Sequence, residues 1–156
     1  MKKENTDKKI ALGCDHRGYP MKERLKDFLK KEGYEPVDCG TFSEEAADYP
    51  DFIIKAAEMV RQGQCARAIG ICHSGIGSSI VANKVKGIRA SLCQNVQQAA
   101  LTRQHNDSNM LILASGFLQD QDVLPLVKVW LNTPFEGGRH ERRVNKITDY
   151  EQQNCK

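Results

Sequence analysis

Apolar residues along the chain gather in short runs separated by segments of mixed polarity. Five of these runs are typical of strands and lie at 9–14, 34–39, 68–71, 88–93 and 110–114. Segments of helical character lie between them; in 19–32, for example, Met21, Leu25, Phe28 and Leu29 recur at helical spacing. The pattern predicts further helices at 51–62, 95–105 and 122–131, one that follows a turn at 72–79, and a polar one over 141–152.

Proline and glycine residues set the expected ends of these elements. Pro20 suits the first turn of its helix, where no backbone donor is needed, and Gly33 suits the helix end. Pro36 indicates an edge strand. We expect Pro125 to fall near the first turn of the helix at 122–131, because a proline further inside removes a hydrogen bond. Residues 40–49 are predicted to form a loop.

Strands that alternate with helices of this length predict an α/β protein with a parallel sheet covered on both faces. Right-handed crossovers place the carboxyl ends of all the strands at one edge of such a sheet. We therefore expect Asp15, His16 and the turn at 72–79 to lie together there. The turn at 105–107 is a candidate for the same edge.

The stretch 66–84 carries the most distinctive pattern, because an apolar strand delivers Cys72 to a turn rich in glycine and serine. Ligands often bind where a parallel strand ends in such a turn. Gly75 and Gly77 allow the backbone to approach a bound group, and the first N–H groups of the next helix favour negative charge. We expect the Cys72 thiol to be unusually acidic there.

Composition narrows the class of protein. A chain of 156 residues, 40% hydrophobic and 28% charged, suits one domain, with 1–8 as an N-terminal extension and 138–156 as a C-terminal helix and tail. A net charge of +3 without clustering argues against nucleic-acid binding. The charged N-terminus and short apolar runs predict neither a signal peptide nor a membrane span, so we expect a cytoplasmic protein.

Six cysteines are present, but no two have the C-x-x-C spacing of common zinc sites. A chain of this size needs no disulfides to fold. We expect free thiols, no structural zinc, and an exposed tail thiol at Cys155.

Five separated motifs resemble the ribose-5-phosphate isomerase B family, which also includes galactose-6-phosphate and allose-6-phosphate isomerases. The motifs, in order, are GCDHRGYPMKE, DYPDF, ICHSGIGSSIVANKVKGIRASL, TRQHNDSN and FEGGRHERRV, within roughly residues 10–151. The resemblance implies a Rossmann-like three-layer α/β/α sandwich with a five-stranded parallel sheet. It also implies a homodimer, or a dimer of dimers, with active sites shared between subunits, and an aldose–ketose isomerisation without cofactor or metal.

The resemblance assigns the central chemistry to the turn at 72–79. Ribose 5-phosphate and ribulose 5-phosphate would interconvert through a cis-enediolate, with Cys72 as the general base. Ser74 and the backbone amides of Gly75, Gly77 and Ser78 would hold the enediolate oxygen. Another branch of the family carries a glutamate base at position 78, so this chain fits the cysteine branch. A buried, inert thiol and a turn that only caps a helix are the structural alternatives.

The other site residues also follow from the resemblance. His105 would protonate the ring oxygen during ring opening, and Asp15 would take the hydroxyl proton. The remaining assignments are the phosphate ligands His16, Arg139 and Arg143, the sugar-binding Asn106, and the pocket residue Tyr49. Three of them have a plainer alternative: a histidine favoured by the helix dipole at 105, and solvated arginines at 139 and 143. We assign no role to His73 or His140, and expect Asn83 and Lys84 to support the loop.

One position departs from the family pattern. After the fifth strand the family commonly carries an arginine that helps to bind phosphate, whereas this chain reads Ala114-Ser115-Gly116. Arg17 stands where relatives often have a small or apolar residue. We hypothesise that Arg17 supplies the missing phosphate contact; a surface arginine at the start of a helix is the alternative.

Three other functions remain open at this point. A six-carbon sugar phosphate is an alternative substrate, because one extra carbon changes binding by only a few kcal/mol. A cysteine phosphotransfer module is the alternative from another class, but phosphatase loops of that kind need an arginine six residues after the cysteine, where this chain has Ser78. A catalytically silent subunit is disfavoured by the joint presence of Cys72, His105 and Asp15.

Overall fold

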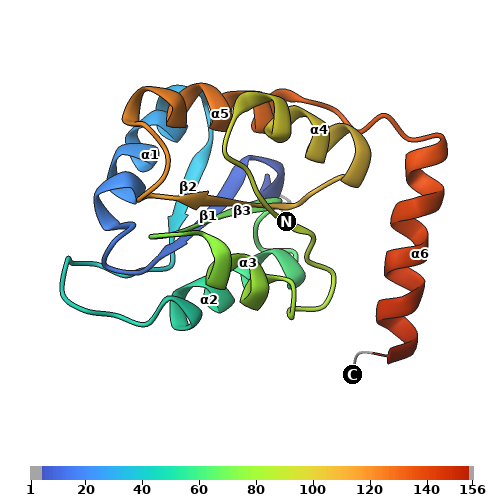
Figure 1. Cartoon of the computed structure of the whole chain (residues 1–156), viewed down its shortest axis with the longest axis horizontal. Coiled ribbons are helices and arrows are strands. Elements are labelled where there is room, and N and C mark those ends of the chain that lie inside the picture. The colour runs from blue at the N-terminus through green and yellow to red at the C-terminus, as the bar shows by residue number, and fades with distance from the viewer. Residues whose placement is uncertain (1–4, 155–156) are drawn as a thin grey trace.

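The computed structural model describes residues 5–154, and its centre is a sheet of five parallel strands (Figure 1). In chain order the strands are β1 (Lys9–Cys14), β2 (Glu35–Asp38), β3 (Arg67–Cys72), β4 (Ala90–Leu92) and β5 (Met110–Ala114). They lie side by side in the order β2-β1-β3-β5-β4, so β2, which contains Pro36, is an edge strand as predicted. A short 3-10 helix, η1 (Thr6–Lys8), precedes the sheet.

Helices cover both faces of the sheet, which confirms the predicted three-layer α/β/α sandwich. Along β1, Ile10, Leu12 and Cys14 point to one face and Ala11 to the other, because successive strand residues alternate. The first face packs against α1 (Tyr19–Lys31), α4 (Val96–Asn106) and α5 (Asp120–Asn132). The second face packs against α2 (Tyr49–Arg61) and α3 (Ile76–Ala82) (Figure 1).

The larger core lies on the first face and contains the only tryptophan of the sequence. Trp130 of α5 is completely buried, and its indole N–H donates to Ser108 Oγ at 2.9 Å. The Arg67 guanidinium lies 5.3 Å from the centre of the ring and donates to the carbonyl of Leu131 at 2.9 Å. This cluster joins α5 to the turn that follows α4.

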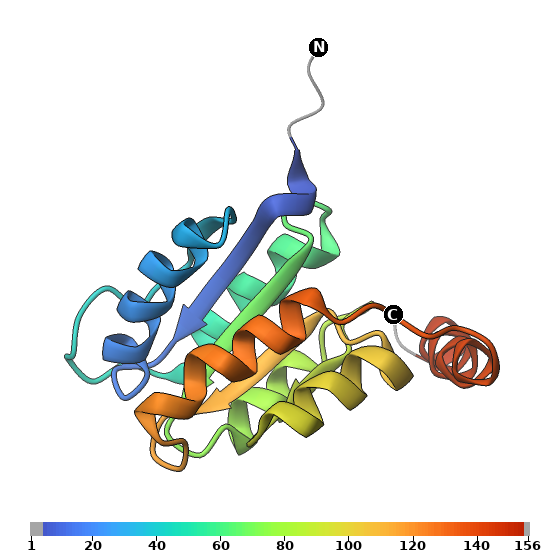
Figure 2. The ribbon, with the colours of Figure 1, turned by 90° about the horizontal axis from the view of Figure 1, so that it is seen from above.

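The last helix, α6 (Arg139–Asn154), stands apart from the three layers, beyond the end of α4 (Figures 1 and 2). The carboxylate of Glu151 ties it to the loop before β4 by accepting the backbone N–H of Gly87, at 2.9 Å to each oxygen. Ile147 and Tyr150 are exposed on it. Among the described residues, no helix combines the length and the apolar character that crossing a membrane requires.

Several element boundaries differ from the prediction. Helix α5 begins at Asp120, so Pro125 lies in its second turn and not near the first. The acidic Asp120 and Asp122 extend the helix backwards, since carboxylates favour a helix N-terminus. Helix α3 begins at Ile76, which makes the glycine-rich turn shorter than predicted. Helix α2 begins at Tyr49, inside the predicted loop.

Candidate active site

The carboxyl ends of β1 and β3 bring Asp15 next to Cys72. The two strands pair with Cys14 opposite Ile71, and the backbone N–H of Asp15 donates to the Ile71 carbonyl at 3.3 Å. Asp15 Oδ1 accepts the backbone N–H groups of Arg17 and Gly18, each at 3.0 Å. The carboxylate is therefore fixed at the edge of the sheet, one strand away from the cysteine.

The neighbouring His16 is held by the loop between β2 and α2. Its Nδ1 atom lies 3.1 Å from the backbone nitrogen of Ala47 and 3.3 Å from the carbonyl oxygen of the same residue. Contact through Nδ1 leaves Nε2 as the ring nitrogen that can meet a ligand.

Cys72 is the last residue of β3, and 4% of its surface is exposed. Its carbonyl accepts both the N–H and the hydroxyl of Ser115, at 2.9 and 3.3 Å, which joins the ends of β3 and β5. In the turn that follows, Ser74 Oγ accepts the N–H of Ile76 at 3.3 Å. Gly75 has φ +74°, a conformation that other residues rarely adopt, and it directs the chain into α3.

Tyr49, the first residue of α2, lies directly against the glycine-rich turn. A Cβ atom added at Gly77 would lie 2.5 Å from both Cζ and the hydroxyl of Tyr49, so only glycine leaves room for this ring. The next residue, Ser78, is fully buried, and its Oγ has no hydrogen-bond partner among the described residues. Position 78 thus lacks the guanidinium that a cysteine phosphatase loop requires six residues after its cysteine.

Four other thiols in residues 5–154 are also free, namely those of Cys14, Cys39, Cys65 and Cys93. Burial raises the pKa of Cys14 to about 11, and it raises the pKa of Cys93 and Cys65 to about 11 as well. Burial also raises the pKa of Cys39. These thiols stay protonated at neutral pH. Cys155 lies outside the described residues.

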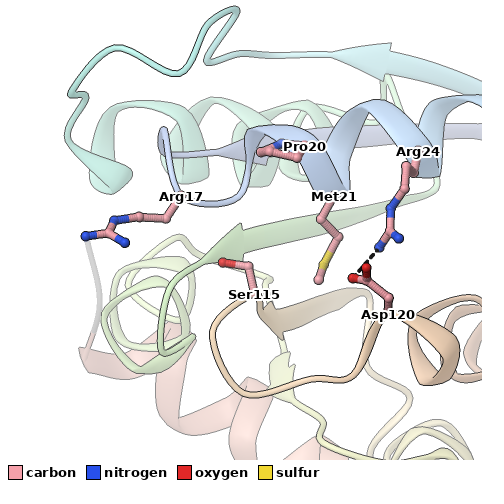
Figure 3. Close-up of a pocket in the computed structure, with 6 residues that line it drawn as sticks. All are labelled: Arg17, Pro20, Met21, Arg24, Ser115 and Asp120. Carbon is pink, nitrogen blue, oxygen red and sulfur yellow. Dashed lines mark hydrogen bonds and ion pairs between the residues drawn. The ribbon is translucent and has the colours of Figure 1, made fainter.

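Arg17 lines a cavity of about 320 Å³ between α1 and the β5–α5 connection (Figure 3). Ser115 lines the same cavity, so Arg17 lies near the segment in which the expected family arginine is missing. Arg24 at the other side of the cavity donates to Asp120 at 3.1 Å (Figure 3). The exposed Arg17 guanidinium, in contrast, has no ion pair with a described residue.

Gly116 lies beneath the ring of His73. A Cβ atom added at Gly116 would lie 2.2 Å from Cε1 of His73, and the His73 ring in turn makes an edge contact with Phe117, with 5.8 Å between centroids. An arginine at position 116 could not be accommodated without displacing His73. The absence of an arginine at position 116 therefore goes with the position of the His73 ring, which fills the space that a side chain would need.

The remaining predicted residues lie at the opposite edge of the sheet. Helix α4 runs from the carboxyl end of β4 back to the amino end of β5, so His105 and Asn106 at its end lie at the amino edge (Figure 2). Arg89, just before β4, donates to the Asn106 carbonyl at 2.9 Å, which marks that edge. The expectation that the turn at 105–107 shares an edge with Cys72 is wrong, because a helix between parallel strands must end where the next strand begins.

Arg139 and Arg143 accompany His105 at this second location. The backbone N–H of Glu136 donates to the Gln104 carbonyl at 3.1 Å, which fixes the start of α6 beside the end of α4. Both arginines are exposed in the first part of α6, four residues apart on a helix, as their spacing predicted.

His140, to which sequence analysis assigned no role, is stacked on His105. The ring centroids are 4.1 Å apart and the rings are 8° from parallel. In the sequence, His140 stands out only because it follows Arg139 and lies four residues after Glu136. Neither feature predicts a contact between α6 and α4.

His105, Glu136 and His140 also place three potential metal-binding atoms within 4.8 Å of one another. The lone pairs of a histidine lie in its ring plane, so two parallel stacked rings cannot both direct a nitrogen at one ion. The Arg139 Nε atom lies 3.5 Å from Nε2 of His140 and adds a positive charge. The arrangement therefore suits a pair of interacting rings better than a metal centre.

The predicted site residues, together with His140, thus form two groups. The carboxyl-edge group comprises Asp15, His16, Arg17, Tyr49, Cys72, Ser74, Gly75, Gly77 and Ser78. The α4–α6 group comprises His105, Asn106, Arg139, His140 and Arg143. They lie at opposite ends of strands such as the six-residue β3, which spans about 17 Å. One chain does not bring the two groups together.

Comparison with known proteins places this arrangement in a family. The family model described as Ribose/Galactose Isomerase matches residues 10–147. Ribose-5-phosphate isomerase B of Escherichia coli is 43% identical over 145 residues, which cover 93% of this chain and 97% of that protein.

Two solved structures are also similar to this chain. Ribose-5-phosphate isomerase B of Clostridium thermocellum is 49% identical with a TM-score of 0.91, over 93% of this chain and 98% of that one. The enzyme of Mycoplasma genitalium with bound ribulose-5-phosphate is 38% identical with a TM-score of 0.90, over 94% and 97% of the two chains. The chain described here therefore belongs to the ribose/galactose isomerase family.

Proposed function

We propose that the protein interconverts ribose 5-phosphate and ribulose 5-phosphate through a cis-enediolate, with Cys72 as the general base. The observation that carries the proposal is the position of Cys72 at the end of β3, between Asp15 and the Gly77–Tyr49 contact, in a chain of this family. Its relatives include a ribose-5-phosphate isomerase B with 43% identity.

The reaction begins with ring opening. His105 donates a proton to the ring oxygen of the furanose while Asp15 accepts the proton of the C1 hydroxyl, which yields the open-chain aldehyde. Asp15 suits this role because its carboxylate is held in place by two backbone N–H groups. A histidine suits the acid role because its ordinary pKa lies near neutrality.

Proton transfer between C2 and C1 follows. The Cys72 thiolate removes the C2 proton, and the electrons move onto the carbonyl oxygen to form the enediolate. Ser74 and the N–H groups of the glycine-rich turn stabilise the developing negative charge. The proton of the C2 hydroxyl then moves to O1, and return of a proton to C1 from Cys72 completes the ketose. The step needs only acids and bases, so we propose no cofactor and no metal.

The active site is completed by a second copy of the chain. The carboxyl-edge group of one subunit faces the α4–α6 group of its partner, which brings His105 and Asn106 to the sugar. Support comes from the separation of the groups within one chain and from exposed apolar side chains on the two helices concerned, namely Ile76 and Ile80 on α3 and Ile147 and Tyr150 on α6. Burial of this surface would stabilise the homodimer.

The phosphate lies at the junction of the two subunits. Arg139 and Arg143 of one subunit form charge-assisted hydrogen bonds with the dianion, and His16 of the other contributes Nε2. Arg17 lies on the same edge as His16 and provides the additional charge that position 116 lacks. We place the protein in the cytoplasm, because its five described thiols are free and a reducing compartment keeps them so.

Mixing two inactive variants tests the shared site. Cys72→Ala and His105→Ala damage different groups, so each homodimer has two defective sites. After unfolding and refolding together in equal amounts, half of the dimers are mixed, and each mixed dimer has one site without either substitution. The expected recovery is about a quarter of wild-type activity. No recovery, with mixed dimers demonstrated by mass spectrometry, would show that each site lies within one chain.

The substrate is tested by comparing kcat/KM for ribose 5-phosphate, allose 6-phosphate and galactose 6-phosphate, with EDTA present throughout. We expect the five-carbon substrate to be preferred. A higher value for either hexose phosphate would move the proposal to the six-carbon substrates. A stable phosphocysteine at position 72 would replace it with phosphotransfer.

A further inference from the structure

His140 is a polar residue buried in a part of α6 where most neighbouring side chains are exposed. Only 5% of its surface is exposed, whereas Arg139, Glu141 and Arg143 around it are exposed. One face of its ring covers the ring of His105 at 4.1 Å and 8° from parallel. A buried histidine in a solvent-facing part of a helix requires a physical explanation, because its polar ring is costly to bury without partners.

The edge of the ring also has polar neighbours. Nε2 lies 3.5 Å from Oε2 of Glu136, in the segment that leads into α6, and 3.5 Å from Nε of Arg139. Glu136 is itself attached to α4 through its backbone N–H and the carbonyl of Gln104. His140 is therefore fixed relative to the end of α4, and the His105 ring can rotate about its side-chain bonds only by losing the stacking contact.

We propose that His140 is a positioning residue that orients the His105 ring for proton transfer to the ring oxygen of the sugar. The inference rests on the proposed function, in which His105 is the acid of ring opening. A histidine on an open helix end has several rotamers, and only a few direct a ring nitrogen at a bound sugar. Misplacement of a catalytic group by about 1 Å can cost a hundredfold in rate.

The charges around His140 agree with this role. Burial lowers the pKa of His140, and His105, Arg139 and Arg143 lower it further, against the opposing effect of Glu136. A neutral His140 can lie against a protonated His105 without the repulsion that two stacked cations would suffer. The same pair with both rings charged would separate, so the neutral state of one ring preserves the position of the other.

The two halves of the reaction allow positioning to be separated from general damage. Ribulose 5-phosphate is acyclic, because phosphate occupies the oxygen that would close its ring. Removal of its C1 proton by Cys72 therefore needs no ring opening, and exchange of that proton in D₂O reports the proton-transfer step without the ring-opening acid. Conversion of ribose 5-phosphate requires ring opening and reports His105 as well.

Three variants carry the test. His140→Ala removes the ring, His140→Phe keeps a flat ring of similar size, and Val144→Ala truncates another buried side chain one turn further along α6 without touching His105. For His140→Ala we expect kcat with ribose 5-phosphate to fall about tenfold or more, while C1 exchange of ribulose 5-phosphate stays near the wild-type rate. His140→Phe should recover most of the lost kcat, and Val144→Ala should resemble the wild type in both assays.

Each outcome has a clear meaning. Unchanged kcat in His140→Ala, or an equal loss of conversion and exchange, would overturn the positioning role. Failure of His140→Phe to recover more activity than His140→Ala would overturn it as well. If His105→Ala leaves ribose 5-phosphate conversion intact, or if the wild type does not convert this substrate, the proposed function fails and not only the inference drawn from it.

Discussion

The two groups of site residues differ in the kind of structure that holds them. The carboxyl-edge group is built on the ends of β1 and β3, in the centre of the sheet, where neighbouring strands and the Ser115 bonds to Cys72 fix the backbone. The α4–α6 group lies on the ends of two helices, one of which stands clear of the sandwich. In the proposed mechanism, the base and the enediolate site therefore lie on the rigid sheet edge, while the acid and the phosphate ligands lie on the helix ends that would meet a second chain.

Cys72→Ala should have the largest effect, because it removes the proposed base from the carboxyl-edge group. We expect kcat to fall by about 10²–10⁴-fold, as measured with ribose 5-phosphate. Cys14→Ala is the matched control: it removes the thiol at the end of the adjacent strand, whose pKa burial raises to about 11. Equal losses in both variants would mean that the edge of the sheet needs these thiols for packing and not for proton transfer.

Arg139→Ala and Arg143→Ala should come next, because they remove the proposed phosphate ligands from the α4–α6 group. Charge-assisted hydrogen bonds contribute about 1.5–3 kcal/mol each, so KM should rise by roughly ten- to a hundredfold. Arg142→Ala, between the two on the same helix, should leave KM near the wild-type value. A rise of the same size for Arg142→Ala would indicate a general effect of positive charge on α6.

Arg17→Ala should raise KM less, by a few-fold, because the guanidinium is exposed and solvent weakens its attraction for phosphate. Arg24→Ala on the same cavity is the control, since Asp120 already pairs with that arginine. Steady-state kinetics at low ionic strength gives the sharpest comparison. If KM is unchanged in Arg17→Ala, the phosphate contact missing at position 116 is not replaced by this residue.

The smallest expected effect is a loss of folding stability in mild acid, which arises from His140 in the α4–α6 group. The folded protein lowers the pKa of His140 below its unfolded value of about 6.5. The unfolded state therefore binds more protons near pH 6, and stability falls as the pH drops through that range.

Urea unfolding of the wild type and of His140→Phe at pH 7.5 and pH 5.5 measures this effect. The variant should lose less stability on acidification, since it lacks the neutral buried imidazole. An identical loss in both proteins would assign the pH dependence to other groups.

The sequence was sufficient to predict the covered parallel sheet and the shared edge at which Asp15, His16 and the turn at 72–79 lie. Apolar strands such as β5 are uninterrupted, and strand ends in a parallel sheet must share an edge, so the proximity of Asp15 and Cys72 follows from topology. The same topology places the end of α4 at the opposite edge, so the location of His105 also follows from the order of the strands and helices.

Other features depend on tertiary contacts that no local pattern encodes. The stacking of His140 on His105 requires the ends of α4 and α6 to meet, although neither ring occupies a position of regular apolar spacing. The shared cavity of Arg17 and Ser115 likewise depends on how α1 packs beside the β5–α5 connection. The start of α5 before Pro125 reflects a balance between acidic residues at the helix N-terminus and one lost hydrogen bond.

Trp130 gives the molecule an intrinsic fluorescent reporter at a useful place. It is the only tryptophan in the sequence, it is fully buried, and its indole N–H is bound to Ser108, three residues after His105. Its emission therefore comes from the region immediately behind the α4–α6 group and from nowhere else in the chain. Subunit association or sugar-phosphate binding that alters the end of α4 can be followed by the wavelength and intensity of this emission, without any added label.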